Sequence, residues 1–229
     1  MIQPSFTTTL TVFTDPQLGG RTMTFGNGDV VCHEYSAADN IFYIIRGQVR
    51  LYAEGPNHSN RLIKILGPGE WFGVASLAGA ATYQQHAVAV GSAVVMEVRV
   101  ERLLALLSQQ PAQLIELSRQ LAQNLLQANE DADRFVFEDC NQRLIGALLR
   151  FSESAASSPR DDGVVLRITH DQLAQAIGVA RETVSLALTQ LRQQNLLQTG
   201  RNQLMFNPET LRRFIGKADQ NHMQHVAVA

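Results

Sequence analysis

The sequence predicts an α+β protein in three parts: an antiparallel β-roll over residues 1–110, a long helix over 111–137 and a helical module with a hairpin over 138–229. Three observations lead to this prediction. Short apolar segments alternate with glycine-containing turns up to about Val98. Beyond Val98 the apolar residues recur at the spacing of helices. Near the C-terminus, two short helical segments flank Gly178 and a hairpin follows them.

The composition is that of a globular protein with its own core, because 45% of the residues are hydrophobic and 17% are charged. The longest weakly polar run, from His86 to Met96, contains Gly91 and is too short to span a bilayer. The N-terminus has no basic flank or apolar segment, so we expect no signal peptide. Two distant cysteines, Cys32 and Cys140, suit the reducing cytoplasm, although a single disulfide is also compatible with them. These features predict a soluble, cytoplasmic protein without membrane spans.

The roll is predicted from short strands in the N-terminal part. The segments with strand character are RTMTF, DVVCHEY, NIFYII, QVRLYAE, RLIKIL, HAVAV and AVVMEV. The turns between them are GNGD, Gly47, EGPNHSN, LGPGE and Gly79. Many short strands with frequent turns favour a sandwich or a roll over a parallel sheet.

The long helix follows a short one over 100–110 that ends at Pro111. Its apolar residues have near-heptad spacing, which is typical of a helix that pairs with a partner helix. The predicted dimer seam consists of Leu114, Leu117, Leu121, Leu125, Ala128, Ala132 and Phe135. In the alternative interpretation the stripe packs on the roll of its own chain. Ile115, Ala122 and Leu126 widen the apolar face and could serve that contact.

The C-terminal module starts with a helix over 138–153 and a polar, linker-like stretch, SESAASSPRDDG. After a strand, VVLRI, Thr169 and Gln172 have the spacing of a capping box that opens a helix ending at Gly178. A second helix follows over 181–194, then a hairpin, LLQTGRNQLMF, that turns at Gly200, Arg201 and Asn202. Asn207 caps a last helix with Pro208 at its first position, and the final dozen residues look frayed.

The net charge of −2 hides an asymmetry. Residues 164–217 contain seven basic residues against three acidic ones, and the rest of the chain contains twelve against eighteen. A basic module on an acidic body suggests a local contact with a polyanion, although a chance distribution over a solvated surface gives the same count.

A helix, a glycine turn, a second helix and a hairpin form the layout of a winged helix-turn-helix, whose second helix enters the major groove of DNA. Arg181 and Glu182 stand at the start of that helix. Arginine can donate two hydrogen bonds to guanine, and glutamate can accept from the amino group of cytosine. The alternative is a surface ion pair, which contributes little to stability.

The chain resembles the CRP/FNR superfamily of bacterial transcription regulators over almost its whole length. The resemblance rests on ITHDQLAQAIGVARETVSLALTQLRQQNLL in the DNA-binding module, NIFYIIRGQVRLY and LGPGEWFGVASLAG in the roll, and Asp139 to Leu144 after the long helix. It implies a cyclic-nucleotide-binding-like roll and a homodimer that binds a near-palindromic DNA site and contacts RNA polymerase, more often as an activator. The DNA contacts it implies are Thr169, His170, Arg181, Glu182, Thr183, Ser185 and Arg201.

The resemblance also implies an effector pocket in the roll and on the long helix. Its candidate residues are Phe72, Gly73, Val74, Ala75, Gln85, His86, Asn124, Ala128 and Asn129. Members that bind cyclic AMP have a glutamate where this chain has Val74, and an arginine with a hydroxyl residue at Gln85 and His86. A buried phosphate would lack its counter-charge here, so we do not expect cyclic AMP to be a strong effector.

The segment FGVASLAG with HAVAV resembles more closely the NtcA-like nitrogen-control branch, which binds 2-oxoglutarate. The arginines of that branch are also missing, so the pocket either binds a less charged molecule or is filled by side chains. The effector is unknown, and no cofactor is expected: two cysteines cannot hold an iron–sulfur cluster, haem is disfavoured, and no zinc spacing is present.

No nucleophile with a base, paired carboxylates or phosphate-binding glycine loop is visible, so an enzyme is not expected. Two functions remain: a DNA-binding transcription regulator, or a ligand-sensing or protein-interaction module with weakened DNA binding. Ala180 in place of a capping residue and Leu186 in place of a polar one favour the second, whereas Arg181 with Glu182 favours the first. A gel-shift assay distinguishes the two.

Overall fold

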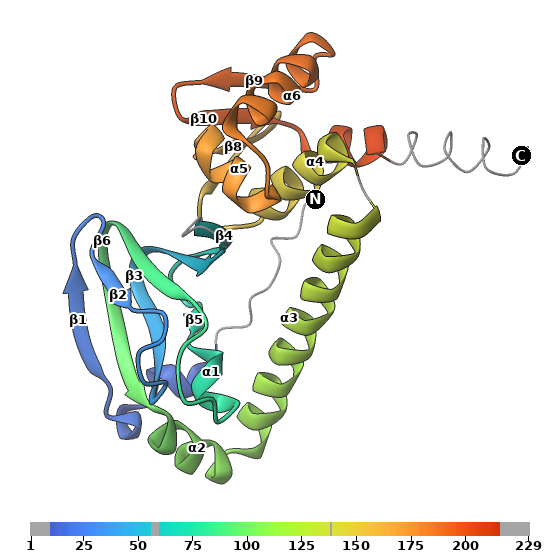
Figure 1. Ribbon diagram of the computed structural model, residues 1–229. Helices are drawn as coiled ribbons and strands as arrows, with labels where there is room; N and C mark the ends of the chain where they lie inside the picture. Colours follow the sequence, from blue (N-terminus) through green and yellow to red (C-terminus); the bar gives the residue numbers. More distant parts are fainter. Residues whose placement is uncertain (1–9, 56–59, 138, 216–229) are drawn as a thin grey trace, which may run out of the picture. The chain divides into compact units, whose positions relative to one another are not determined.

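The computed structural model describes residues 10–55, 60–137 and 139–215, without the side chains of 131 and 133–137. The chain divides into two units, Met1–Ala132 and Asp133–Ala229 (Figure 1). The long helix therefore belongs mostly with the roll. The predicted seam residue Phe135 and the predicted frayed terminus lie outside this description.

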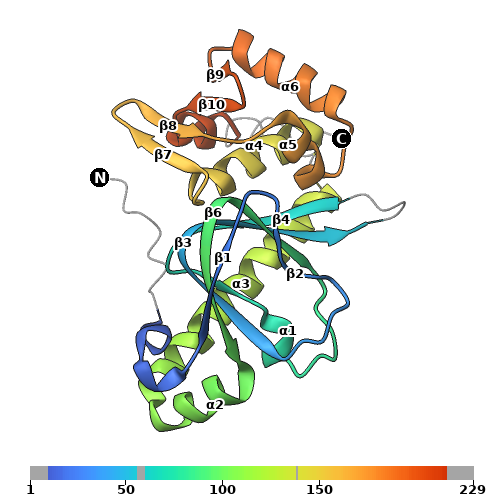
Figure 2. The same cartoon turned by 90° about the vertical axis from the view of Figure 1, so that its left-hand side faces the viewer.

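The N-terminal unit contains an antiparallel sheet in the order β1-β6-β3-β4, with β2 paired to β6 and β5 paired to β3 (Figure 2). Its elements are η1 (Thr11–Thr14), η2 (Pro16–Leu18), β1 (Arg21–Phe25), β2 (Val30–Cys32), β3 (Asn40–Glu54), β4 (Asn60–Leu66), β5 (Trp71–Phe72), α1 (Val74–Leu77), β6 (His86–Arg99), α2 (Val100–Gln109) and α3 (Pro111–Phe137). The predicted antiparallel roll is confirmed, while β5 and α1 were not predicted.

Two long strands replace four predicted short ones. β3 continues through Gly47, where its register with β6 shifts, and β6 continues through Gly91. Gly47 has a φ of 87°, and a Cβ at this position would collide with the carbonyl oxygen of Ser92. Gly47 therefore forms a bulge inside a strand, not the predicted turn between two strands.

Two apolar clusters hold this unit together. One fills the roll and includes Phe42, Val49, Leu51, Phe72 and Tyr83. The other joins the outside of the sheet to the helices and consists mainly of Leu10, Val12, Phe13, Leu18, Ile41, Tyr43, Val98, Leu103, Leu106, Leu107 and Leu117. The N-terminal segment and α2 thus anchor the beginning of α3 to the roll.

The C-terminal unit combines helices with a small antiparallel sheet in the order β7-β8-β10-β9. Its elements are α4 (Cys140–Ser152), β7 (Ser157–Arg160), β8 (Gly163–Leu166), α5 (His170–Ile177), α6 (Arg181–Gln193), β9 (Leu197–Gly200) and β10 (Gln203–Phe206). The stretch predicted as a linker contains β7, which forms a hairpin with β8. The winged layout is confirmed.

Local capping signals fix the helices of this unit. Asp139 and Gln142 form a capping box at the start of α4, and Thr169 and Gln172 form the predicted one at the start of α5. The side chain of Asn207 accepts hydrogen bonds from two backbone N–H groups that follow it, as expected for its predicted capping role. Among the described residues, the helices are too short or too polar to cross a membrane.

Candidate nucleic-acid interface and effector region

The turn between α5 and α6 is set by Gly178. This residue has a φ of 70° and ends α5 in a left-handed conformation, with its N–H donating to the carbonyl of Ala174 at 2.9 Å. The N–H of Val179 donates to the same carbonyl at 3.1 Å. The turn brings the apolar faces of the two helices together, and Leu173, Ile177, Val184, Leu188 and Leu191 are all buried. The opposite face of α6 is therefore free for another contact.

The first turn of α6 presents the predicted base-recognition residues to solvent. Arg181, Glu182 and Thr183 are exposed, and Leu186 is 67% exposed one turn later. Within the described part of the chain, neither Arg181 nor Glu182 has an ion-pair partner, and they do not pair with each other. The described residues therefore do not support the interpretation of this pair as a surface salt bridge.

His170 and Ser185 connect the two helices by side-chain hydrogen bonds. The Nδ1 atom of His170 lies 2.9 Å from the hydroxyl oxygen of Ser185, which in turn donates to the carbonyl of Arg181 at 3.0 Å. The side chain of Thr169 accepts from the N–H of Gln172 at 3.2 Å. Both His170 and Thr169 thus stand at the beginning of α5, and His170 lies beside α6.

The wing is the hairpin of β9 and β10, in which Leu204 pairs with Thr199. Arg201 and Asn202 form its turn, with Asn202 at a φ of 55°, and both side chains are exposed. Arg201 is therefore available to an external polyanion. Ala180, before α6, makes no side-chain cap, as its residue type predicts.

Sequence reasoning missed two exposed residues on α6. Thr189 and Gln190 follow Leu186 by three and four positions and are exposed on the same side of the helix. Helical periodicity applied to Glu182 and Leu186 was the signal that could have identified them.

In the effector region, the side chain of His86 contacts Tyr52 and Glu34, which are not among the candidate pocket residues. Its imidazole stacks on Tyr52, with ring centroids 5.3 Å apart, and its Nδ1 atom lies 3.7 Å from a carboxylate oxygen of Glu34. The neighbouring pair Leu51 and Ala87 belongs to the core of the roll. Since successive residues of a strand point to opposite faces, His86 points away from that core, which corrects the expectation for this residue.

The remaining roll residues of the predicted pocket have differing surroundings. Phe72 is buried and stacks on Phe42, with ring centroids 5.0 Å apart, while Ala75 packs at the edge of the same cluster. Gly73 precedes α1 in a left-handed conformation, and Val74 is 48% exposed. Gln85 is half-buried.

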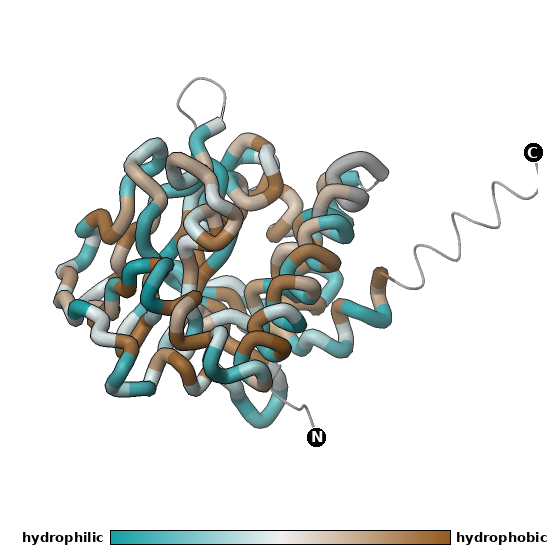
Figure 3. Tube along the Cα trace, turned by 90° about the horizontal axis from the view of Figure 1, so that it is seen from below, coloured by the Kyte–Doolittle hydropathy of each residue, from teal (hydrophilic) through white to brown (hydrophobic). Residues whose placement is uncertain are grey.

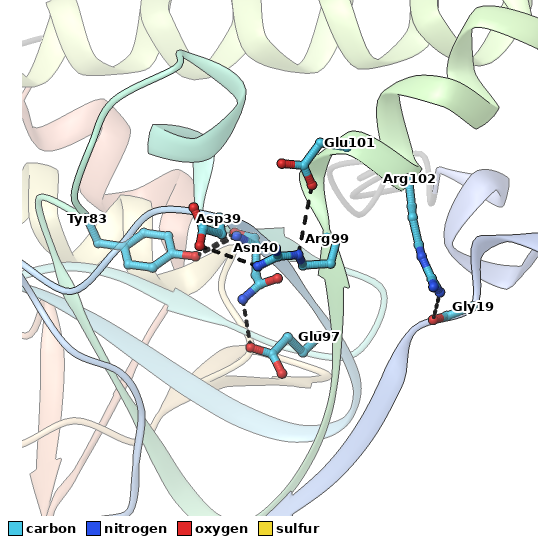
Figure 4. Close-up of polar contacts among 8 residues, drawn as sticks. All are labelled: Gly19, Asp39, Asn40, Tyr83, Glu97, Arg99, Glu101 and Arg102. Atoms are coloured by element: carbon cyan, nitrogen blue, oxygen red, sulfur yellow. Dashed lines mark hydrogen bonds and ion pairs between the residues drawn. The ribbon is translucent and has the colours of Figure 1, made fainter.

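Polar contacts fix the loop that leads into β6 (Figure 4). The hydroxyl of Tyr83 donates to the carbonyl of Asn40 at 2.7 Å and accepts from its N–H at 3.0 Å. Burial raises the pKa of Tyr83 to about 12, so its hydroxyl remains a donor at neutral pH. The side-chain amide of Asn40 donates a hydrogen bond to the carboxylate of Glu97 at 2.9 Å. These bonds tie the loop before β6 to the start of β3.

The predicted pocket residues on α3 are exposed. Asn124 accepts a hydrogen bond from Nζ of Lys64 on β4 at 3.3 Å, and this bond links the helix to the sheet. Ala128 and Asn129 lie further along the helix. The buried polar residue of α3 is Gln120, which accepts from the indole N–H of Trp71 at 2.9 Å.

The predicted dimer seam divides between two environments. Leu117 is 4% exposed and belongs to the core of its own roll, and Leu121 packs against the same cluster. Leu117 is therefore unavailable to a partner helix, which corrects the expectation. Leu114, Leu125, Ala128 and Ala132 are exposed. Hydrophobic segments recur along α3 (Figure 3). Ile115 and Leu126, which the alternative interpretation assigned to a contact with the roll, are exposed as well.

Both cysteines are free, and burial raises the pKa of Cys32 to about 12. In the part of the chain that the structure describes, no group of three or more His, Cys, Asp or Glu side chains is placed to hold a metal ion.

Comparisons with known proteins agree with this architecture. Residues 22–110 match a cyclic nucleotide-binding domain, and residues 142–214 match a Crp-like helix-turn-helix domain. A roll of the first kind joined to a helix-turn-helix of the second kind defines a DNA-binding transcription regulator. The chain belongs to the CRP/FNR family of transcription regulators, which are not enzymes and bind DNA as dimers.

Named relatives show the range of this family. The chain is 29% identical to the transcriptional regulator SdrP of Thermus thermophilus, over 78% of this chain and 86% of that protein. It is 26% identical to a CRP-like cAMP-activated global transcriptional regulator of Mycobacterium tuberculosis, over 93% of both. A solved CRP/FNR-family regulator of T. thermophilus has a TM-score of 0.68 at 25% identity, covering 84% of this chain and 97% of that one.

Likeness in fold extends to regulators with other signals. The c-di-GMP responsive regulator CLP of Xanthomonas campestris has a TM-score of 0.71 at 23% identity, over 82% of this chain and 94% of that one. Proteins of this fold thus differ in the nucleotide named for them, and the fold alone does not name the effector of this chain.

Proposed function

We propose that the protein is a homodimeric, sequence-specific regulator whose α6 helices bind a near-palindromic DNA site. The half-site centres are one helical turn apart, about 34 Å. The observation that carries this proposal is the exposed Arg181–Glu182 pair in the first turn of α6, for which the described residues supply no ion-pair partner. On an exposed surface, the arginine can donate hydrogen bonds to a DNA base and the glutamate can accept them.

Arg181 binds a guanine through its O6 and N7 atoms, and Glu182 accepts from the amino group of a cytosine on the opposite strand. By family resemblance, this pair favours a TGA-like core in each half-site. Leu186 offers only an apolar contact, for example to a thymine methyl group, so the position it meets is less strictly recognised. Thr169, His170 and Arg201 position the module on phosphates.

The dimer forms along the exposed part of α3. The proposed interface keeps the exposed residues of the predicted seam, which are Leu114, Leu125, Ala128 and Ala132. It also includes the exposed side chains of Ile115 and Leu126. Leu125 and Leu126 are 62% and 64% exposed, and burying such side chains against a partner helix is favourable. As in the activators that the chain resembles, the DNA-bound dimer would contact RNA polymerase.

We further propose that cyclic AMP is not the effector. Val74 supplies no carboxylate for a ribose, and Gln85 carries no charge. His86 is turned toward Glu34, whose carboxylate would repel a phosphate. A less charged metabolite, or no ligand, fits these residues better, and the same lack of arginines argues against 2-oxoglutarate despite the NtcA-like segment.

Selection from a random duplex library, followed by binding measurements, tests the DNA-binding proposal. The wild type should enrich a two-fold symmetric site. Arg181→Ala should lose about 1–3 kcal/mol on that site and discriminate poorly at one guanine. Arg192→Ala, at the last turn of α6, is the matched control and should retain the sequence preference.

Two outcomes would contradict the proposal. If Arg181→Ala keeps full selectivity, the base contact lies elsewhere. If the wild type enriches no sequence, the chain is instead a ligand-sensing or protein-interaction module with weakened DNA binding.

A further inference from the structure

Contacts with the roll fix the rotation of α3 about its own axis. Three of them are hydrogen bonds, at 3.3 Å from the backbone N–H of Val12, at 2.9 Å from the indole of Trp71 and at 3.3 Å from Nζ of Lys64. The fourth is the burial of a leucine in the core of the roll. The residues of α3 that make these contacts are, in this order, Gln113, Gln120, Asn124 and Leu117. Their spacing of three or four residues defines one face of the helix.

A second stripe of α3 lies on the side that is turned away from the roll. At about 100° per residue, the centre of this stripe is roughly 140° from the residues that contact the roll. It consists of exposed residues only, which are Ile115, Ser118, Ala122, Leu125, Asn129 and Ala132. Their spacing alternates between three and four residues, so they occupy the core positions a and d of a coiled coil.

Two members of this stripe are polar, and they differ in their hydrogen bonds. The hydroxyl of Ser118 donates to the carbonyl of Leu114 at 2.9 Å, so it is satisfied within its own helix. No other described residue forms a hydrogen bond with the side chain of Asn129. An amide has both donors and an acceptor, so two asparagine side chains can bond to each other. An asparagine at position a of a parallel coiled coil fixes the register and the number of helices, at a cost in stability.

We propose that Asn129 sets the register of the dimer, with its amide hydrogen-bonded to the same amide of a second copy between two parallel α3 helices. This role rests on the proposed dimer along α3. Ile115 at position a and Leu125 at position d are the combination that favours two strands. Leu114 and Ala128 then lie beside the core positions and extend the apolar contact. Asn129, assigned to the effector pocket by resemblance, instead serves the choice of partner.

Cysteine cross-linking tests the register. In a Cys140→Ser background, in which the remaining Cys32 is buried, single cysteines are introduced on α3 and oxidised with diamide. A disulfide needs Cα atoms about 4.4–6.8 Å apart, so it forms fastest between residues that meet across the two-fold axis. Asn129→Cys should therefore form covalent dimers about tenfold faster than Gln123→Cys, the matched control at an exposed position outside the stripe. Faster cross-linking of Ala128→Cys or Gln123→Cys than of Asn129→Cys overturns this register.

Subunit exchange tests the contact between the two amides. The wild type and Asn129→Leu, distinguished by an affinity tag, are mixed, and the three kinds of dimer are quantified by native mass spectrometry. An amide opposite a leucine has no partner, so mixed dimers should be about threefold rarer than the half that random exchange gives. Asn129→Leu alone should dimerise about tenfold more tightly than the wild type, because no amide is buried. Gln123→Leu is the matched control and should exchange at random with the wild type.

The outcomes separate this role from the dimer itself. A wild type that sediments as a monomer at micromolar concentration overturns the proposed dimer, and the role of Asn129 with it. A stable dimer whose subunits exchange at random with Asn129→Leu overturns the role of Asn129 while the dimer stands.

Discussion

Replacing Gln120 should weaken the attachment of α3 to the roll. The indole N–H of Trp71 on β5 donates to the side-chain oxygen of Gln120 at 2.9 Å, and Gln120 is 8% exposed. Gln120→Met keeps the length of the side chain but removes this acceptor. A buried donor that loses its partner costs about 1–3 kcal/mol. Because Trp71 is half-buried and water can reach part of it, we expect about 1–2 kcal/mol.

Urea unfolding followed by tryptophan fluorescence measures this loss directly, because Trp71 is the single tryptophan of the chain. With a slope of about 2 kcal/mol per M urea, in the middle of the typical range, the midpoint should fall by roughly 0.5–1 M. The emission maximum should also shift, since the indole loses a polar partner. Gln123→Met, at an exposed position of the same helix, is the control. An unchanged midpoint and spectrum in Gln120→Met would refute the contribution of this bond.

Three further predictions concern the exposed face of α3 and the two cysteines. Leu125→Glu combined with Leu126→Glu should convert the dimer to a monomer in sedimentation experiments, because like charges would face each other across the two-fold axis; a variant that remains dimeric would place the interface elsewhere. Burial raises the pKa of Cys32 to about 12, so at pH 8 a thiol reagent should modify Cys140 much faster than Cys32 in the folded protein, and both after unfolding. Above about pH 9 the thiol of Cys32 ionises in the unfolded chain but not in the folded one, so its contribution to stability should decrease as the pH rises further. Equal reaction rates in the native state would contradict the burial of Cys32.

The helices and caps of the C-terminal unit could be predicted because their signals are local. Thr169 with Gln172, Gly178, and Asn207 with Pro208 each act within one turn of helix. The strands of the roll were harder, since a glycine with positive φ serves a turn and a bulge equally well. Only the pairing of β3 with β6 makes Gly47 a bulge.

Some residues of the predicted site could be placed from the local sequence, whereas the placement of others depends on tertiary contacts. The exposure of Arg181 and Glu182 follows from the amphipathic pattern of α6, and could be inferred before the structure was known. The heptad pattern of α3 could not say which leucines face the roll, because the same spacing suits either neighbour; Leu117 is buried by η1 and α2. His86 was placed in the pocket by resemblance, whereas its partner across the ladder, Tyr52, determines where its ring lies.

The order of strands in the C-terminal sheet constrains how the protein is made. β10, the last strand among the described residues, lies between β8 and β9 and hydrogen-bonds to both, with Leu204 opposite Leu166 on one side and Thr199 on the other. A growing chain that has not yet released Phe206 from the ribosome leaves β8 and β9 without their shared neighbour. The wing can therefore close only once residues 203–206 are available. A chain that ends before β10 lacks the strand that joins β9 to β8.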